Sequence, residues 1–421
     1  MKTITTPNPD RQYYIDWLRI LLILSVFLFH IGMVFNTWGW HIKNDQTYGG
    51  MLRYIMIHLH NWRMPLLFLI SGAGTYYALG KRTPKQYLGE RARRLLIPLI
   101  AGIFILVPVQ VYIEKSAQYS SLPEFYMHMF EGTYPSGNFS WHHLWFIAYL
   151  FLLSLIISPF LNFFRSGRFD LFIGKLSRII SRPLGANIFL VPLLASQFIL
   201  RPFFPDFTNA LVNDWAAIAY YLIFFLSGYI LLSSKPIIEA IRKQKLLFLA
   251  EGIMITILWF TLPGMAKSED TQDLIWNILA VFLAWSCAMT AIGFAKQYLN
   301  KNSKFRKLAT EAIYPFYLLH QPAIVIIGHF IIQWDIATGW KVVLITFSAF
   351  FSAVSIYWLL IRPFNLSRML FGMPRLKEKR PKPIILSPVK AILAYAQRSA
   401  ETLNFKKKVL NPVSQNTERT M

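Results

Sequence analysis

Arg19 and His30, in the first apolar segment of the chain, carry side chains suited to anion binding and to acid–base chemistry. They stand eleven positions apart, and eleven helical steps of about 100° return to within about 20° of the starting direction. Both side chains therefore share one helix face, roughly 16 Å apart along the axis. We predict a polar stripe that joins an anion-binding guanidinium to a titratable imidazole. A topology anchor and a packing histidine are the alternative interpretation.

A second polar group lies in the ninth apolar segment. Tyr317 and His320 are three residues apart and share a helix face, and Gln321 and Pro322 follow them. Charged side chains in hydrocarbon cost about 2.5 to 3.5 kcal/mol on insertion scales, and unpaired polar groups are also unfavourable there. We therefore expect His320 to face the interior of a helix bundle.

Further histidines gather near the predicted outer ends of two other segments. His60 and Arg63 open the second segment, and His143 and Trp145 open the fourth. Ordinary aromatic decoration of the membrane interface is the alternative interpretation of these residues. His58 and His60 do not share a helix face, and no HExxH pattern accompanies them, so we predict no metal site.

Ten apolar segments supply the scaffold for these side chains. A hydrocarbon core of roughly 30 Å takes about 20 helical residues, which is the order of length of these segments. Hydrophobic residues make up 55% of the chain and aromatic residues 16%, as expected for a membrane protein. We predict an all-α bundle of about ten transmembrane helices near residues 17–35, 62–79, 95–113, 143–164, 186–202, 214–232, 246–263, 274–295, 312–333 and 341–361.

Basic residues alternate between the loops. Lys and Arg gather after the second, fourth, sixth and eighth segments, whereas the other loops carry scattered basic residues and several acidic ones. Because short loops rich in Lys and Arg stay in the cytoplasm, both termini are predicted to be cytoplasmic. The net charge of +23 then suits the anionic lipid of a bilayer. We predict no nucleic-acid binding, since no soluble segment interleaves basic with aromatic residues.

The chain divides into a cytoplasmic N-terminal segment (1–13), a transmembrane domain (14–365) and a basic cytoplasmic tail (366–421), partly amphipathic or disordered. No loop is long enough for an independent core. The single cysteine, Cys287, excludes an internal disulfide and cysteine-ligated metal clusters. The Ser71–Gly72 pair lacks the flanking glycines of a nucleophile elbow and instead favours close helix packing.

Three arginines, Arg91, Arg93 and Arg94, open the third segment on the same predicted side as Arg19. They are either topology signals or a cluster at the mouth of a cavity. Guanidinium groups grip phosphates through paired hydrogen bonds. A donor that carries a nucleotide would need such a site.

Five motifs are spread along the apolar segments: YIDWLRILLILSVFLFH (14–30), MPLLFLISG (64–72), RARRLLIP (91–98), HLWFIAYLF (143–151) and YLLHQP (317–322). Together they resemble the acyltransferase-3 family of integral membrane acyltransferases, whose hallmark is an Arg, ten residues and a His. Arg19 and His30 match that hallmark. The resemblance covers about residues 13 to 365, and the chain looks most like bacterial members that modify glucans with succinyl groups.

The resemblance implies an O-acyltransferase of the bacterial cytoplasmic (inner) membrane that needs no metal. It would move an acetyl or succinyl group from cytoplasmic acyl-CoA (acetyl-CoA or succinyl-CoA) to a hydroxyl of an extracytoplasmic glycan or other envelope molecule. Arg19 with Arg93 or Arg94 would hold the CoA phosphates. His30 would be the general base on the acceptor hydroxyl, or else a transient acyl carrier.

Other polar residues would assist His30. His320, Tyr317 and Arg63 would orient its ring or stabilise the developing oxyanion. The acceptor sugar would contact the outer aromatic residues Trp38, His60, His143 and Trp145. The outer halves of the segments offer no carboxylate, so we expect His30 to act as a neutral base.

Two other classes of membrane protein fit part of the pattern. A secondary transporter or flippase for a glycan or lipid-linked sugar would also combine about ten helices with intramembrane histidines. The two halves of the sequence, however, show no clear repeat and no paired Gly-rich broken helices. A purely structural or regulatory protein would not need Arg19 and His30 on one face.

Overall fold

The computed structural model describes residues 12–79, 82–205, 207–376, 397 and 399–403. These residues form helices, turns and loops with two isolated β-bridges and no extended sheet, so the all-α prediction is confirmed for them. Contacts divide the chain into two units, Met1–Arg375 and Leu376–Met421. Most of the predicted N-terminal segment and most of the predicted amphipathic tail lie outside the described residues.

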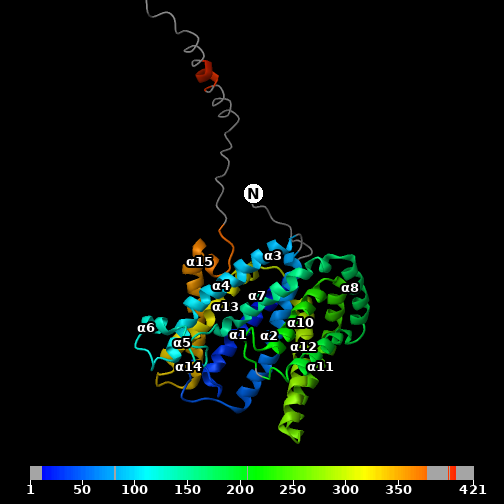
Figure 1. Ribbon diagram of the computed structural model, residues 1–421, viewed down its shortest axis with the longest axis horizontal. Coiled ribbons are helices and arrows are strands. Elements are labelled where there is room, and N and C mark those ends of the chain that lie inside the picture. The colour runs from blue at the N-terminus through cyan, green and yellow to red at the C-terminus, as the bar shows by residue number, and fades with distance from the viewer. Residues whose placement is uncertain (1–11, 80–81, 206, 377–396, 398, 404–421) are drawn as a thin grey trace, which may run out of the picture. The chain divides into compact units, whose positions relative to one another are not determined.

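The first unit is built from helices joined by turns and by longer loops such as 36–49 and 201–214 (Figure 1). In chain order they are α1 (Tyr13–Phe35), α2 (Gly50–Leu79), α3 (Pro84–Arg91), α4 (Ile97–Ile105), α5 (Val107–Glu114), α6 (Leu122–His128), α7 (Trp145–Ile157), α8 (Gly167–Ile180), α9 (Leu190–Leu200), α10 (Trp215–Leu232), α11 (Lys235–Thr261), α12 (Glu269–Tyr298), α13 (Lys304–Ile331), α14 (Thr338–Ile356) and α15 (Asn365–Leu370). A π-helical turn, Ala92–Leu96, joins α3 to α4, and another, Tyr357–Ile361, extends α14.

Seven helical runs among the described residues are long and apolar enough to cross a membrane. They are Tyr13–Phe35, Pro84–Glu114, His142–Leu161, Trp215–Leu232, Lys235–Met265, Glu269–Tyr298 and Thr338–Ile361. The other three predicted segments are also helical: α2 and α13 contain several polar side chains that lower their mean hydropathy, and the helix that ends with α9 is shorter. The multi-pass prediction is therefore confirmed, with seven spans by this measure.

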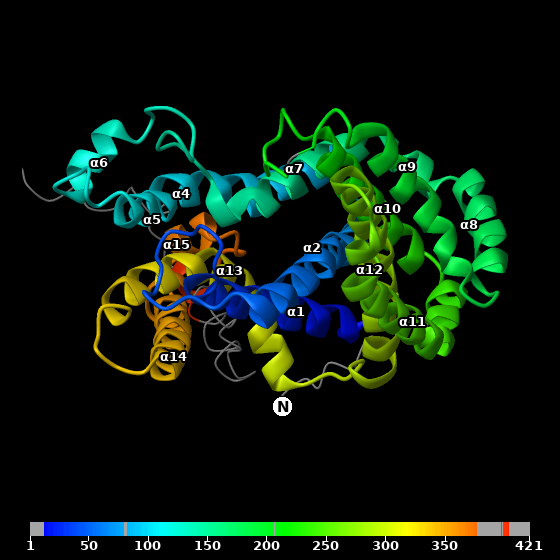
Figure 2. The same ribbon diagram turned by 90° about the horizontal axis from the view of Figure 1, so that it is seen from below.

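Two central helices carry much of the site. Helix α1 packs against α2, α12, α13 and α14, and α2 also packs against α10 and α12 (Figure 2). The crossing of α2 and α10 depends on glycine, because a Cβ atom added at Gly72 would lie 1.8 Å from the Phe225 carbonyl oxygen. One added at Gly228 would lie 1.8 Å from the Leu69 carbonyl oxygen. The predicted close packing at Gly72 is confirmed.

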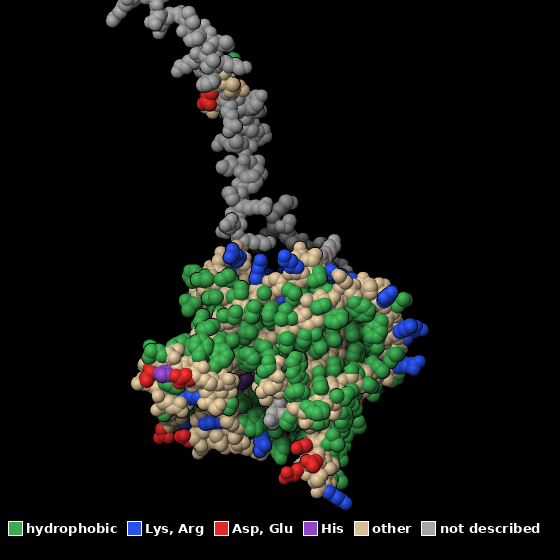
Figure 3. All heavy atoms as spheres, in the orientation of Figure 1, with side chains coloured by type: hydrophobic (Ala, Val, Ile, Leu, Met, Phe, Trp, Pro, Cys, Tyr) green, Lys and Arg blue, Asp and Glu red, His purple; other side chains and the backbone are tan. Residues whose placement is uncertain are grey.

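Charged side chains of the first unit separate toward opposite edges (Figure 3). On the face that Figure 3 shows, Lys and Arg side chains gather along the edge where α3, α8 and α15 lie in Figure 1, with a few at the opposite edge, and the visible Asp and Glu side chains lie toward that opposite edge. A broad band of hydrophobic side chains lies between them. This is the distribution that the positive-inside rule produces in a membrane protein.

Candidate active site

The two histidines that the sequence singled out on different helices meet in the structure. His30, near the end of α1, and His320, in the middle of α13, stack with ring centroids 5.0 Å apart and planes inclined by 22°. The His30 Nδ1 atom lies 2.9 Å from the His320 Nε2 atom, which is a hydrogen-bond distance. His320 is fully buried, and His30 is half-buried. The contact joins the predicted stripe of α1 to the polar face of α13.

The hydrogen bond to the Tyr317 carbonyl oxygen shows which nitrogen atoms of His320 and His30 carry protons. This oxygen lies 2.5 Å from His320 Nδ1, and a carbonyl oxygen only accepts, so His320 Nδ1 carries a proton. A neutral His320 then has a lone pair at Nε2, which accepts the proton of His30 Nδ1. This assignment leaves His30 with an unprotonated Nε2, the kind of atom that a general base needs.

His143 joins the pair because a proline frees a carbonyl of α13. Pro322 has no N–H to donate to the Leu318 carbonyl four residues earlier, and His143 Nε2 donates to that oxygen at 3.1 Å instead. The ring of His143 stands edge-on to that of His320, with centroids 5.3 Å apart. The Tyr317 hydroxyl donates to the backbone carbonyl of His143. We call His30, His143, Tyr317 and His320 the histidine cluster.

Three other predicted site residues contact Phe29, which precedes His30 in α1. The Arg63 guanidinium lies 4.2 Å from the centroid of the Phe29 ring, the His60 ring stacks at 5.5 Å, and the Trp38 ring is tilted at 6.4 Å. Arg63 is only 3% exposed. Its Nη1 atom donates to a backbone carbonyl of α1 at 3.5 Å, and its Nε atom has no hydrogen-bond partner among the described residues. Arg63 is thus a buried donor beside the histidine cluster.

Trp145 lies away from the place predicted for it, and a second tryptophan, Trp40, contacts His30 instead. Trp145 packs among core aromatic rings, with centroids 6.1 Å from Phe68 and 5.6 Å from Tyr221, and it lines neither of the cavities described below. Trp40, from the loop after α1, stacks on His30 with centroids 5.9 Å apart and planes inclined by 12°. Sequence spacing does not predict the contact of Trp40 with His30, because a loop residue has no helical spacing that links it to a helix.

A cavity of about 810 Å³ opens beside α1, α2, α3 and α13. We call it the arginine cavity, after the cations among its lining residues: Arg19, Arg91, Arg94 and Lys307. Acidic residues line it as well: Asp16, Glu90 and Glu311. The cavity is large enough for a drug-sized ligand, since such pockets usually measure roughly 300 to 1,000 Å³.

Two of the three arginines that open the predicted third segment line this cavity. Arg91 and Arg94 are three residues apart and share a face, and both line the cavity. Arg93 is exposed and is not among the lining residues. Arg94 also forms an ion pair with Glu90 at 3.1 Å. Arg94 therefore lies at the cavity, whereas Arg93 does not.

Arg19 shares its acidic neighbour with another cation. Asp16 lies 3.8 Å from Arg19 and makes a shorter ion pair with the buried Arg306 of α13. Because Arg306 is the closer partner of Asp16, the charge of Arg19 is only partly neutralised there. The Arg19 side chain is 31% exposed, and it lines the arginine cavity.

The arginine cavity reaches the histidine cluster at Tyr317. Tyr317 lines the cavity together with Phe146, and the two rings have centroids 5.9 Å apart. The Tyr317 ring in turn lies 5.6 Å from that of His320 and 5.8 Å from that of His143. One row of side chains therefore connects the cationic cavity to the buried imidazoles.

A carboxylate just beyond the predicted third segment (95–113) pairs with a buried histidine. Glu114, the last residue of α5, has an oxygen 2.5 Å from His41 Nδ1, and it accepts a hydrogen bond from the Tyr134 hydroxyl at 2.9 Å. Burial, and then the charge of Glu114, raise the pKa of Tyr134 above its usual value, so this hydroxyl stays protonated. His41 Nε2 lies 3.1 Å from the amide nitrogen of Gln321, the neighbour of His320. The pairing depends on a folded loop, which sequence spacing does not reveal.

These features define an integral membrane protein in which a buried histidine cluster adjoins a cavity lined by arginines. A family model described as "Acyltransferase domain" matches residues 12–362. The chain belongs to this family, the acyltransferase-3 family, and the protein is therefore a membrane acyltransferase.

More specific similarity covers only part of the chain. The chain is 27% identical over 160 residues to proteins named "Glucans biosynthesis protein C" from Salmonella paratyphi B and from Salmonella enteritidis PT4. The matched region is 36% of this chain and 39% of each relative's length. No solved structure matches the chain.

Proposed function

We propose that the protein moves an acetyl or succinyl group from cytoplasmic acyl-CoA to a hydroxyl of a glycan, or of another envelope molecule, on the outer side of the bacterial cytoplasmic membrane. About ten spanning helices with both termini in the cytoplasm would place the arginine cavity on the inner side. The partial similarity to proteins named for glucan biosynthesis supports a glucan as acceptor.

The donor would bind in the arginine cavity. CoA carries phosphate groups, and Arg19, Arg91 and Arg94 present guanidinium groups to the cavity that can hold phosphate oxygens through paired hydrogen bonds. Arg93, which lies outside the lining, would act at most by long-range attraction. The thioester end of the donor would then point along the cavity toward Tyr317.

The transfer itself would take place at His30. His30 Nε2 removes the proton of the acceptor hydroxyl as the oxygen attacks the thioester carbonyl carbon. The new C–O bond forms, the C–S bond breaks, and the proton passes from His30 to the departing CoA sulfur. Arg63, whose buried Nε atom lacks a partner among the described residues, would donate to the developing oxyanion.

The single observation that carries this proposal is the hydrogen-bonded pair of His30 and His320, with its protons assigned by the Tyr317 carbonyl. The pair leaves one basic nitrogen on His30 and holds its ring in place. As His30 gains a proton at Nε2, it can share the positive charge with His320 through the same hydrogen bond.

Proteoliposomes that contain the purified protein test the proposal. Radiolabelled acetyl-CoA or succinyl-CoA is added on one side of the membrane, and a glucan is enclosed on the other. We expect label on the glucan only when the donor is on the side of the arginine cavity. Movement of unmodified glucan across the membrane, with no acylation, would instead support a flippase and contradict the proposal.

A further inference from the structure

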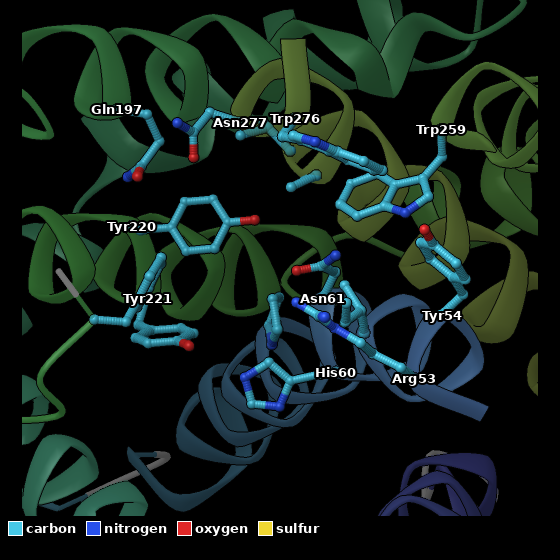
Figure 4. A pocket seen from close by; sticks show the side chains of 15 residues that line it. Arg53, Tyr54, His60, Asn61, Gln197, Tyr220, Tyr221, Trp259, Trp276 and Asn277 are labelled. Carbon is cyan, nitrogen blue, oxygen red and sulfur yellow. The ribbon is translucent and has the colours of Figure 1, made fainter. Parts of the chain in front are cut away.

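A second cavity, of about 530 Å³, lies between α2, α9, α10, α11 and α12. We call it the aromatic pocket, and Figure 4 shows the side chains that line it. Two tryptophans, Trp259 of α11 and Trp276 of α12, form one wall, with ring centroids 4.3 Å apart and planes inclined by 63°. Tyr54 and Tyr220 also line the pocket. Its volume falls in the range of roughly 300 to 1,000 Å³ that is usual for small-molecule sites.

The pocket holds polar atoms whose hydrogen-bonding capacity is unused. The side-chain nitrogen of Asn61 and the Nε1 atom of Trp259 are buried and have no hydrogen-bond partner among the described residues. Buried polar groups in folded proteins are nearly always paired, so these two nitrogens call for a partner such as an ordered water or a ligand in the pocket.

The chemistry of the lining selects the kind of ligand. Arg53 is the only Lys, Arg, Asp or Glu among the described residues that line the pocket, so the lining offers no carboxylate for a cationic ligand. Aromatic faces carry a negative potential, and the C–H bonds of a sugar ring pack well against them. The amide groups of Asn61, Gln197 and Asn277 can exchange hydrogen bonds with sugar hydroxyls. A lipid acyl chain would leave these polar groups unpaired.

The pocket adjoins the proposed transfer site through two rings. His60 lines the pocket and stacks on Phe29 with centroids 5.5 Å apart. The Phe29 ring in turn lies 5.7 Å from the ring of His30. A glycan anchored in the pocket could therefore place a neighbouring hydroxyl near His30.

We infer that the aromatic pocket binds a sugar residue of a neutral glycan acceptor, by stacking on Trp276 and Trp259 and by hydrogen bonds to Asn61. The inference rests on the proposed function, which it deepens by assigning the acceptor subsite. The predicted acceptor residues Trp38 and His60 would then contact the glycan between this subsite and His30.

Equilibrium binding of a radiolabelled β-linked gluco-oligosaccharide tests the pocket without relying on catalysis. The full-length protein is purified in a detergent without a sugar headgroup, since a glucoside or maltoside would compete. We expect Trp276→Ala to weaken binding at least tenfold and Asn61→Ala to weaken it severalfold. Trp276→Phe, which keeps an aromatic face, is expected to retain most of the affinity and shows that the position tolerates substitution.

The matched control is Trp334→Ala, because Trp334 is 50% exposed and is not among the residues that line the pocket. Its affinity is expected to equal that of the wild type. Equal affinities of wild type and Trp276→Ala would overturn the inference. So would a wild-type protein that binds no oligosaccharide, including one whose pocket takes up a labelled phospholipid instead.

Binding and transfer together separate this inference from the proposed function. Oligosaccharide binding that depends on Trp276, with no acyl transfer by the wild type, would support the pocket and reject the transferase proposal. Acyl transfer with the same KM for the glycan in wild type and Trp276→Ala would support the transferase proposal and reject the pocket as the acceptor subsite.

Discussion

His320 Nδ1 donates to the Tyr317 carbonyl oxygen at 2.5 Å, and this bond decides which nitrogen of His30 stays unprotonated. Donor and acceptor lie three residues apart on one helix, so the orientation of His320 is set locally. Because His320 Nε2 is then unprotonated, it accepts a hydrogen bond from His30 Nδ1, and this bond sets the tautomer of His30. The basicity of a residue on α1 thus depends on the backbone of α13.

Replacing His320 by alanine is expected to lower kcat by about 10²-fold, since His30 would lose the partner that fixes its tautomer and shares its charge. The KM for each substrate should change little, because the lost interaction acts in the transition state. Steady-state kinetics of the purified variant provide the measurement. A kcat within twofold of wild type would show that the pair is structural.

Replacing Arg19 or Arg94 by alanine is expected to raise the KM for acyl-CoA about tenfold, as expected for the loss of one charge-assisted phosphate contact. Arg93→Ala should have a smaller effect, because Arg93 does not line the cavity. Arg178→Ala, at an exposed position on α8, serves as the control. An equal rise in KM for all four variants would indicate a general effect of charge and no specific site.

The burial of His320 inside the bundle could be predicted, because polar groups are costly in hydrocarbon. The contact between His30 and His320 could only be suggested, since no pattern in one sequence aligns the heights of two helices. The choice between Arg93 and Arg94 required the directions in which the π-helical turn Ala92–Leu96 presents its side chains. Which of these side chains contact one another depends on how the helices pack, and helical spacing within one segment does not show that.

Incubation with labelled acyl-CoA in the absence of acceptor distinguishes a base from an acyl carrier. If His30 Nε2 acts as the proposed proton acceptor, no label is expected on the His30 peptide after rapid quenching and mass spectrometry. Stoichiometric acyl-imidazole at His30 would instead establish a two-step mechanism through a covalent intermediate.

Gly72→Ala is expected to destabilise the protein by about 1 to 3 kcal/mol, because the added methyl group would overlap the Phe225 carbonyl and force α2 and α10 apart. Thermal unfolding in detergent measures the effect. Gly89→Ala is the matched control on α3, since a Cβ atom there meets nothing within 4 Å. Identical melting temperatures for wild type and Gly72→Ala would contradict the close packing.

Two contacts between distant segments could not be predicted, for the same physical reason. Glu114 reaches His41 only because the loop after α1 folds back, and Trp259 meets Trp276 only because α11 and α12 pack side by side. Neither pair has a sequence spacing that indicates its contact. Contacts between distant segments depend on the whole fold, whereas spacing within one helix does not.

The most direct test of the central claim compares the rates of acyl transfer by wild type, His30→Ala and His329→Ala. His329 lies on α13, and its ring contacts Phe330, so it controls for the loss of a histidine outside the cluster. We predict that His30→Ala loses at least about 10³-fold in kcat while still binding acyl-CoA, and that His329→Ala retains the wild-type rate. Equal rates for His30→Ala and wild type would contradict the account.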